Sequence, residues 1–138
     1  MVTRFYGKFI NIALFDKLKV LSNFRWAEFT YPSTLHLSGF LPALIEPVNK
    51  DKLIMEKVEL GLHEALVNAV KHGNLSDPSK RLRVRRIITP NWFVWQVQDQ
   101  GKGTPNDFRK GILPERLEVD SGRGLYMIYQ CFDDVRWS

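Results

Sequence analysis

The sequence predicts an α/β (α+β) fold, a two-layer sandwich in which helices cover one face of a mixed, mostly antiparallel sheet. Two segments with alternating apolar residues, 81–89 and 92–99, are separated by a short Pro-Asn turn, which predicts two antiparallel strands. Apolar residues recur at helical spacing over 53–72, and a second helix is predicted after Gly124. The last residues, DVRWS, predict the beginning of a final strand.

The composition is that of one globular domain. The chain has 138 residues, of which 44% are hydrophobic and 25% are charged, and its formal net charge of +5 permits an anionic partner without naming one. Cys131 is the single cysteine, so an internal disulfide and a cysteine metal cluster are excluded. No apolar run approaches ~20 residues and no signal-peptide cleavage site is evident, so we expect a cytoplasmic protein.

The chain before the long helix is less regular. Apolar residues at helical spacing within residues 1–25, among them Phe9 and Ile12, predict a helix there. A strand is predicted over 26–31, where a proline stops it. Gly39 and Pro42 interrupt the next segment, so any helix there is predicted to be short or to begin near Pro42, because proline is tolerated in a first turn.

The helix over 53–72 carries an apolar stripe with three polar residues on its flank. The stripe consists of Met55, Val58, Leu62, Ala65, Leu66 and Ala69. Beside it, Glu64, Asn68 and Lys71 lie within about 60° of each other on an ideal helix. Glu64 could accept a proton, the Asn68 amide oxygen suits magnesium, and Lys71 could meet a phosphate. Spacing alone favours a simpler interpretation, a solvated face with an ordinary Glu–Lys pair.

A second polar motif ends the strand over 92–99. Asp99 lies in phase with the apolar face of that strand and is followed by Gly101 and Gly103, without the third glycine and the helix of a Rossmann fingerprint. An aspartate there could accept a hydrogen bond from an exocyclic amine, and the glycines would let the backbone approach a flat ring. The alternative is a plain glycine turn capped by Asp99.

A third motif lies before the second predicted helix. Gly122 and Gly124 precede this helix, and the free amides at a helix start attract phosphate. The alternative is a loop with an ordinary helix cap.

The sharpest basic cluster lies in the first strand of the predicted pair. Arg81, Arg83 and Arg85 would share one face of that strand, with Leu82 and Val84 on the other. This pattern is most simply a solvent-exposed face. Binding of nucleic acid or of an acidic protein is the alternative.

In this order, the motifs resemble the GHKL ATP-binding fold (the Bergerat fold) of histidine kinases, gyrase-type ATPases and bacterial anti-sigma serine kinases. HEALVNAVKHGN resembles the N box, DQGKG the first glycine box and GRGLYMI the second. The ending GRGLYMI…DDV and the short lid, which is the segment between the two glycine boxes, resemble the anti-sigma factor serine/threonine kinase branch. The resemblance assigns residues 26–138 to the ATP-binding domain and leaves 1–25 as an extension of unclear role. The family usually has one more strand, so we expect a sheet edge that is open or completed by another chain.

The resemblance implies a role for each polar residue. Glu64 would be the catalytic residue, Asn68 the magnesium ligand and Asp99 the acceptor for the adenine amine. Asn68 and Asp99 would be joined in nucleotide binding by Lys71, Gly101, Gly103, Gly122, Arg123 and Gly124. ATP and Mg²⁺ are the implied cofactors, and Lys71 is the position that varies in the serine-kinase branch.

The implied function is that of a regulatory serine kinase that uses ATP. It would phosphorylate an anti-sigma-factor antagonist of the STAS type and sequester a sigma factor. We expect a homodimer, because the family pairs through its early sheet region and aromatic residues are abundant there: Phe5, Tyr6, Phe9, Phe15, Phe24 and Trp26. The alternative is a nucleotide-binding interaction module that binds partners without phosphorylating them, and a surface for nucleic acid ranks third.

Overall fold

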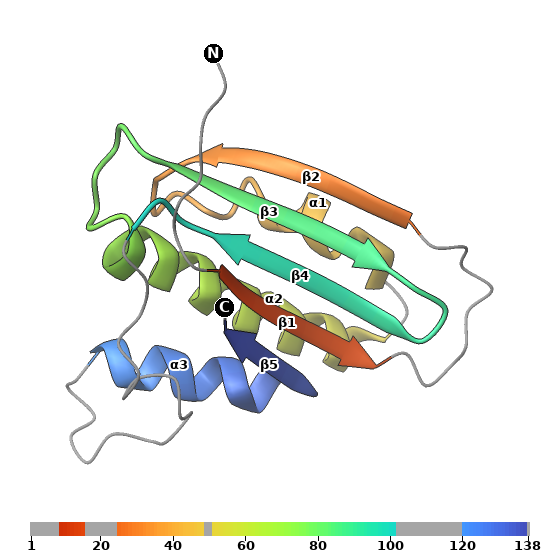
Figure 1. Cartoon of the computed structure of the whole chain (residues 1–138). Helices are drawn as coiled ribbons and strands as arrows, with labels where there is room; N and C mark the ends of the chain where they lie inside the picture. Colours follow the sequence, from red (N-terminus) through yellow and green to blue (C-terminus); the bar gives the residue numbers. More distant parts are fainter. Residues whose placement is uncertain (1–8, 16–24, 49–50, 102–119, 138) are drawn as a thin grey trace.

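The computed structural model describes residues 9–15, 25–48, 51–101 and 120–137, and this part of the chain forms two layers (Figure 1). The strands are β1 (Phe9–Phe15), β2 (Arg25–Pro32), β3 (Arg81–Ile88), β4 (Trp92–Gln98) and β5 (Asp134–Trp137). The helices are α1 (Leu41–Ile45), α2 (Lys52–Asn68) and α3 (Asp120–Cys131). A 3₁₀ turn, η1 (Glu46–Val48), follows α1, and a π-helical turn, η2 (Ala69–Gly73), follows α2. None of the helices in these ranges is long and apolar enough to cross a membrane.

The strands form one sheet in the order β2-β3-β4-β1-β5, and each neighbouring pair is antiparallel. The helices lie on one face of this sheet, so the predicted α/β sandwich is confirmed (Figure 1). The register places Phe29 opposite Val84, and Val84 opposite Val97. It also places Trp95 opposite Ile12. Apolar positions of neighbouring strands therefore fall on the same face.

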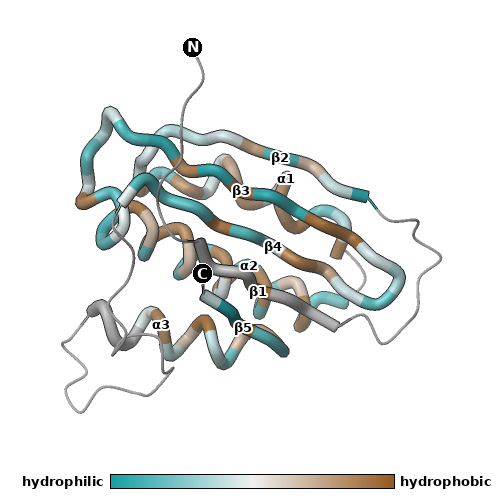
Figure 2. Tube along the Cα trace, viewed as in Figure 1, coloured by the Kyte–Doolittle hydropathy of each residue, from teal (hydrophilic) through white to brown (hydrophobic). Residues whose placement is uncertain are grey.

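The core lies between the inner face of the sheet and the helices. The sheet contributes Ile12, Leu82, Val84, Phe93, Trp95 and Val97. The helices contribute Val58, Leu62, Ala65, Leu66, Leu125 and Ile128. Figure 2 shows hydrophobic residues gathered along α2 and alternating with hydrophilic ones along β3. The predicted stripe of α2 is confirmed, with Met55 only partly buried at its start.

The N-terminal segment differs from its prediction. The helix expected within residues 1–25 is wrong for Phe9–Phe15, which form β1. β1 lies between β4 and β5, and Ile12 is completely buried opposite Trp95 and Val135. The segment FINIALF satisfies a helical spacing, but it has a single polar residue and is rich in Phe and Ile, which favour strands. Pairing with two strands distant in sequence decides between the two conformations.

The short helix α1 is fastened to the sheet by two side chains of the inner face. The completely buried Trp95 donates its indole N–H to the Leu44 carbonyl at 2.9 Å, as a buried indole requires. Arg86 donates to the Ala43 carbonyl at 2.5 Å, and its guanidinium lies 5.4 Å from the centre of the Phe29 ring. Burial lowers the pKa of Arg86. This arginine therefore belongs to the helix-covered face of β3.

The other arginines of β3 point away from the helices. Leu82 and Val84 are buried, so the predicted alternation is confirmed. The Arg85 Nε lies 2.7 Å from the Glu28 carboxylate, and the Arg83 Nε donates to the Gln98 side chain at 3.1 Å. These pairings fit the interpretation of a solvent-exposed sheet face, and the nucleic-acid alternative stays a prediction.

The long helix starts at a capped end and finishes in a wider turn. The Asp51 side chain accepts hydrogen bonds from the backbone amides of Leu53 and Ile54 in the first turn of α2. At the other end, the Asn74 amide donates to the Ala69 carbonyl at 2.8 Å, five residues back along the chain, as a π turn requires. Leu75 and Ser76 then adopt left-handed φ values of 53° and 57°. Both features are frequent at functional sites.

Candidate nucleotide-binding site

The site forms where η2, the turn that follows α2, meets the segment that follows β4. Gly73, the last residue of η2, faces Asp99: a Cβ built on Gly73 would lie 2.7 Å from the Asp99 Cβ and closer still to its carboxyl group. A Cβ built on Gly101 would lie 2.6 Å from the Gly73 carbonyl carbon. Such distances are well inside van der Waals contact, so a side chain at either glycine would force the two segments apart.

Asp99 continues the inward face of β4 beyond Trp95 and Val97, and it is half-buried. Its Oδ1 accepts a hydrogen bond from the Gly101 amide at 2.7 Å, which orients the carboxyl group. Burial raises the pKa of Asp99, and the Gly101 amide and the charge of Lys80 oppose that rise. A partly desolvated and oriented carboxylate is a strong acceptor for an exocyclic amine. The predicted role of Asp99 therefore fits its environment.

The predicted polar column divides into two parts. Glu64 and Asn68 lie half-buried on α2, whereas Lys71 lies in η2 and is exposed. The wider π turn begins directly after Asn68, so the straight column of an ideal helix does not continue to Lys71. Glu64 and Asn68 thus stay together at the edge of the core, and the phosphate contact of Lys71 stays a prediction.

The prediction that Gly122 and Gly124 precede the last helix is wrong. α3 begins at Asp120, so both glycines lie inside it. Gly122 still falls among the first residues, whose amides have no intrahelical partner, whereas Gly124 lies beyond them. A Cβ built on Gly124 would lie 3.1 Å from Glu64 Oε2, so this glycine faces α2. Glycine costs only about 1 kcal/mol within a helix, and it therefore does not mark where a helix begins.

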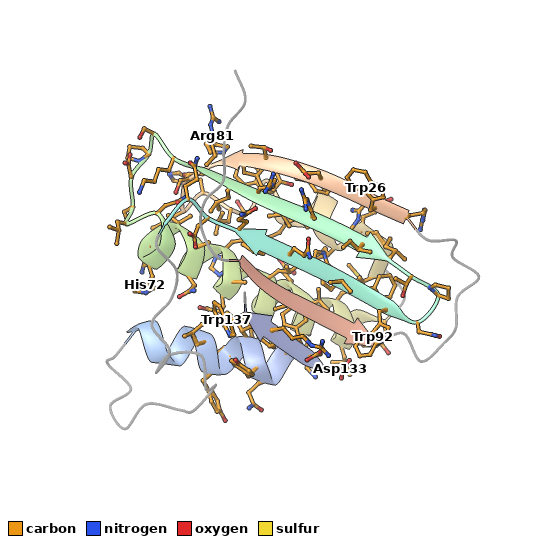
Figure 3. The ribbon with its side chains drawn as sticks, viewed as in Figure 1. Trp26, His72, Arg81, Trp92, Asp133 and Trp137 are labelled. Carbon is orange, nitrogen blue, oxygen red and sulfur yellow. The ribbon has the colours of Figure 1, made fainter. Side chains whose placement is uncertain are left out.

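Motifs that are distant in the sequence meet in space. The segment after β4 contacts the end of η2 through Asp99, and Glu64 of α2 lies beside Gly124 of α3. Figure 3 shows η2, marked by His72, and the start of β3, marked by Arg81, toward the same end of the sandwich. Two predicted site residues fall outside this description: Gly103 and the side chain of Arg123.

Gly73 and Asn74 are assigned no site role from the sequence, because they directly follow the predicted helix over 53–72 and are residues that commonly end a helix. Asn74 is completely buried, and its side-chain oxygen accepts a hydrogen bond at 2.8 Å from the amide of Gln100, the neighbour of Asp99. Glycine and asparagine after a helix usually indicate a C-cap. This local interpretation accounts for both residues, so it gives no reason to expect the contact of Gly73 with Asp99 or the bond of Asn74 to Gln100. The partner of Asn74 is 26 positions away, so no local spacing could have revealed it.

The residues present fit an adenine nucleotide with a magnesium ion. Asp99, Gly73 and Gly101 form a polar cradle that a side chain at either glycine would fill. The Asn68 amide oxygen is a hard ligand, which suits magnesium. Across the described ranges, no three His, Cys, Asp or Glu side chains form a metal-binding group. Magnesium commonly uses one or two protein ligands together with water and substrate phosphates. The donor set therefore suits a metal ion that binds together with the nucleotide.

Comparison with known families agrees with this geometry. The family model of the histidine kinase-like ATPase domain matches residues 39–138, which include α2, β4 and α3. β1 and β2 precede the matched region. A comparison with curated proteins finds no match. Because the family match covers well over half of the chain, the protein belongs to the histidine kinase-like ATPase domain family and is an ATP-binding domain of the GHKL type.

Proposed function

We propose that the protein is a regulatory serine kinase that uses ATP to phosphorylate an anti-sigma-factor antagonist and that sequesters a sigma factor. The observation that carries this proposal is that two acidic groups lie at separate places beside the long helix. Asp99 is held against Gly73, in the π turn after α2, whereas Glu64 belongs to α2 itself and faces Gly124 of α3. This separation supports a nucleotide whose base contacts Asp99 and whose phosphates lie toward Glu64, beside α3.

Phosphoryl transfer depends on positioning and charge stabilisation more than on covalent catalysis. Asn68 would ligate the magnesium ion, which neutralises phosphate charge when it is bound. Glu64 would accept the proton of the attacking serine hydroxyl while the new O–P bond forms and the bond to the leaving ADP oxygen breaks. The exposed Lys71 would act on the phosphates as a solvent-screened charge.

Glu64→Gln tests this assignment, because it keeps the shape and a hydrogen-bonding group but removes the basic carboxylate. ATP binding should survive, since Asp99 holds the base. Single-turnover transfer to a cognate antagonist should fall by about 10²- to 10⁴-fold. His72→Ala is the matched control, because His72 is exposed on η2 and is the rival proton acceptor. Parental transfer by Glu64→Gln, together with loss of transfer in His72→Ala, would overturn the assignment.

A second candidate function is a nucleotide-binding interaction module. The observation that favours it is an apolar row on the outer face of the sheet, formed by the exposed Trp26 and the half-buried Ile87 and Val94, which suits a protein partner whether or not phosphate is transferred. Mixing the protein with labelled ATP and candidate antagonists separates the two functions. Label transfer supports the kinase, and a stable complex without transfer supports the module. Salt-sensitive binding of DNA would support the nucleic-acid alternative instead.

The same apolar row supports a homodimer formed through the outer sheet face. Trp26 of β2 lies opposite Ile87 of β3, which lies opposite Val94 of β4. Trp26 is 65% exposed, and Figure 3 shows it on β2, an edge strand of the sheet. Light scattering at micromolar concentration should give twice the chain mass of 16.1 kDa, and Trp26→Glu should reduce it to one chain. A parent protein that scatters as a monomer would count decisively against the dimer.

A further inference from the structure

Asn74 is a completely buried polar residue that joins four segments of the chain beside the site. Its Nδ2 donates to the Ser33 hydroxyl and to the Arg81 carbonyl, each at 3.1 Å. Its Oδ1 accepts from the Gln100 amide at 2.8 Å. Its own backbone amide donates to the Ala69 carbonyl. The residue therefore ties the end of η2 to the loop after β2, to the start of β3 and to the segment after β4.

The hydrogen-bonding capacity of this side chain is well used. Both hydrogens of the Asn74 amide group have acceptors, and its oxygen has a donor. Around it, the Ser33 amide donates to the Lys80 carbonyl at 3.1 Å, and the Arg81 amide donates to the Gln100 side chain at 2.7 Å. A buried polar network that is satisfied in this way holds its members in one arrangement.

The network reaches the nucleotide site through a single peptide group. The Gln100 amide, which Asn74 holds, belongs to the peptide that joins Asp99 to Gln100. On one side of this peptide, β4 ends at Gln98, and on the other the Gly101 amide bonds to the Asp99 carboxyl group. The direction of that carboxyl group is thus set by backbone that the Asn74 side chain fixes.

We propose that Asn74 is a positioning residue that sets the selectivity for adenine by holding Asp99 in one orientation. The inference rests on adenine recognition by Asp99. At the same ring position, adenine presents an amine donor and guanine a carbonyl acceptor. With guanine bound, the carboxylate would face the carbonyl oxygen and would have no donor. It rejects guanine strongly only if it cannot turn away from that oxygen, because a fixed polar group that is left unpaired makes a site selective. Asn74 itself makes no contact with the base.

The test is a double-mutant cycle of Asn74→Ala and Asp99→Asn, with the affinities for ATP and GTP measured by calorimetry. Asn74→Ala should lower ATP affinity roughly tenfold, and should lower the ratio of ATP to GTP affinity by a similar factor, because a loosened acceptor loses its discrimination. In the Asp99→Asn background, Asn74→Ala should change ATP affinity by less than about twofold, since both changes remove the same contact. Equal factors in the two backgrounds would overturn the proposal.

Ser33→Ala is the matched control, because it removes a partner of the same side chain and leaves the bond to Gln100 intact. It should lower thermal stability while the ATP-to-GTP ratio stays within about twofold of the parent. Asn74→Ser has a side chain too short to reach the Gln100 amide but keeps a polar group at the buried position, so it should lower the ratio as Asn74→Ala does and serves if Asn74→Ala fails to fold. An unchanged ratio in Asn74→Ser, or a collapsed ratio in Ser33→Ala, would overturn the proposal.

Failure of adenine recognition by Asp99 would look different. If Asp99→Asn alone leaves ATP affinity unchanged, Asp99 does not recognise the base, and the role of Asn74 falls with it. If Asp99→Asn weakens ATP binding while Asn74→Ala leaves the ATP-to-GTP ratio unchanged, Asp99 keeps its role and only the role of Asn74 is lost.

Discussion

The two ends of the candidate site are built in different ways. At the Asp99 end, Gly73 and Gly101 bring two backbone segments into contact, and the buried Asn74 bonds them together. At the Glu64 end, the contact with α3 passes through the tip of a half-buried side chain, which lies beside Gly124. Backbone packing therefore pre-forms the Asp99 end, where we expect the base to bind, whereas the Glu64 end, where we expect phosphoryl transfer, consists of side chains that can move at low cost.

The largest effect is expected from Gly101→Ala, at the Asp99 end of the site. A Cβ there would collide with the Gly73 carbonyl, a backbone group that cannot step aside. We expect a loss of about 3 kcal/mol in the free energy of unfolding and a collapse of ATP binding, measured by denaturation and calorimetry. Gly39→Ala is the matched control, since a Cβ at Gly39 would meet nothing within 4 Å. Similar losses of unfolding free energy in both variants would show that Gly101 and Gly73 are not tightly packed.

The next effect is the pH dependence of stability that Asp99→Asn removes. Burial raises the folded-state pKa of Asp99 above its ordinary value of 3.8. The folded protein therefore binds a proton at this carboxyl group more tightly than the unfolded chain does. The parent should lose stability relative to Asp99→Asn as pH rises from that value through the raised folded-state pKa. The difference should be smallest in acid and largest at neutral pH, with an effect below that of Gly101→Ala. A difference in denaturation midpoint that is constant across pH would contradict the burial of this carboxylate.

Gly124→Ala tests the Glu64 end with the same substitution, glycine to alanine. The new methyl group would meet only the Glu64 Oε2, at 3.1 Å, and this side chain can shift by a few tenths of an ångström. Alanine is the better helix former, so α3 should gain about 0.5–1 kcal/mol of stability. The measurement is thermal or chemical denaturation. A loss as large as that of Gly101→Ala would remove the contrast between the two ends.

The smallest effect is expected from Lys71→Ala. The side chain is exposed on η2, so its attraction to phosphate is screened by water and salt. ATP binding should weaken by less than about 1 kcal/mol, and the loss should vanish at high salt. Lys52→Ala, at the opposite end of α2, is the control and should leave affinity unchanged. A large, salt-independent loss would place Lys71 in a desolvated site.

Most of the fold could be predicted because local periodicity and tertiary burial agree. The alternation in β4 placed Trp95 on the inner face, and Asp99 continued the same phase at its end. β1 could not be predicted, because FINIALF suits helix and strand alike, and its pairing with β4 and β5 decides. The choice is made by contacts whose partners lie near the other end of the chain.

The candidate site was predicted only in part, for a related reason. Glu64, Asn68 and Asp99 stand out locally, since their chemistry is unusual beside an apolar stripe or strand. The bond from Asn74 to Gln100 cannot be read from spacing, because it joins residues 26 positions apart. The π turn also follows from the contacts at the helix end, where the Asn74 amide reaches back to the Ala69 carbonyl.

Recognition of adenine by Asp99 is tested most directly by calorimetric titration of the parent and Asp99→Asn with ATP and magnesium. A hydrogen bond to a charged group is worth about 1.5–3 kcal/mol, so the variant should bind ATP about one to two orders of magnitude more weakly. The variant keeps an oxygen for the Gly101 amide, and its fold should be intact or more stable than that of the parent. Equal ATP affinity in the two proteins would contradict the role of Asp99.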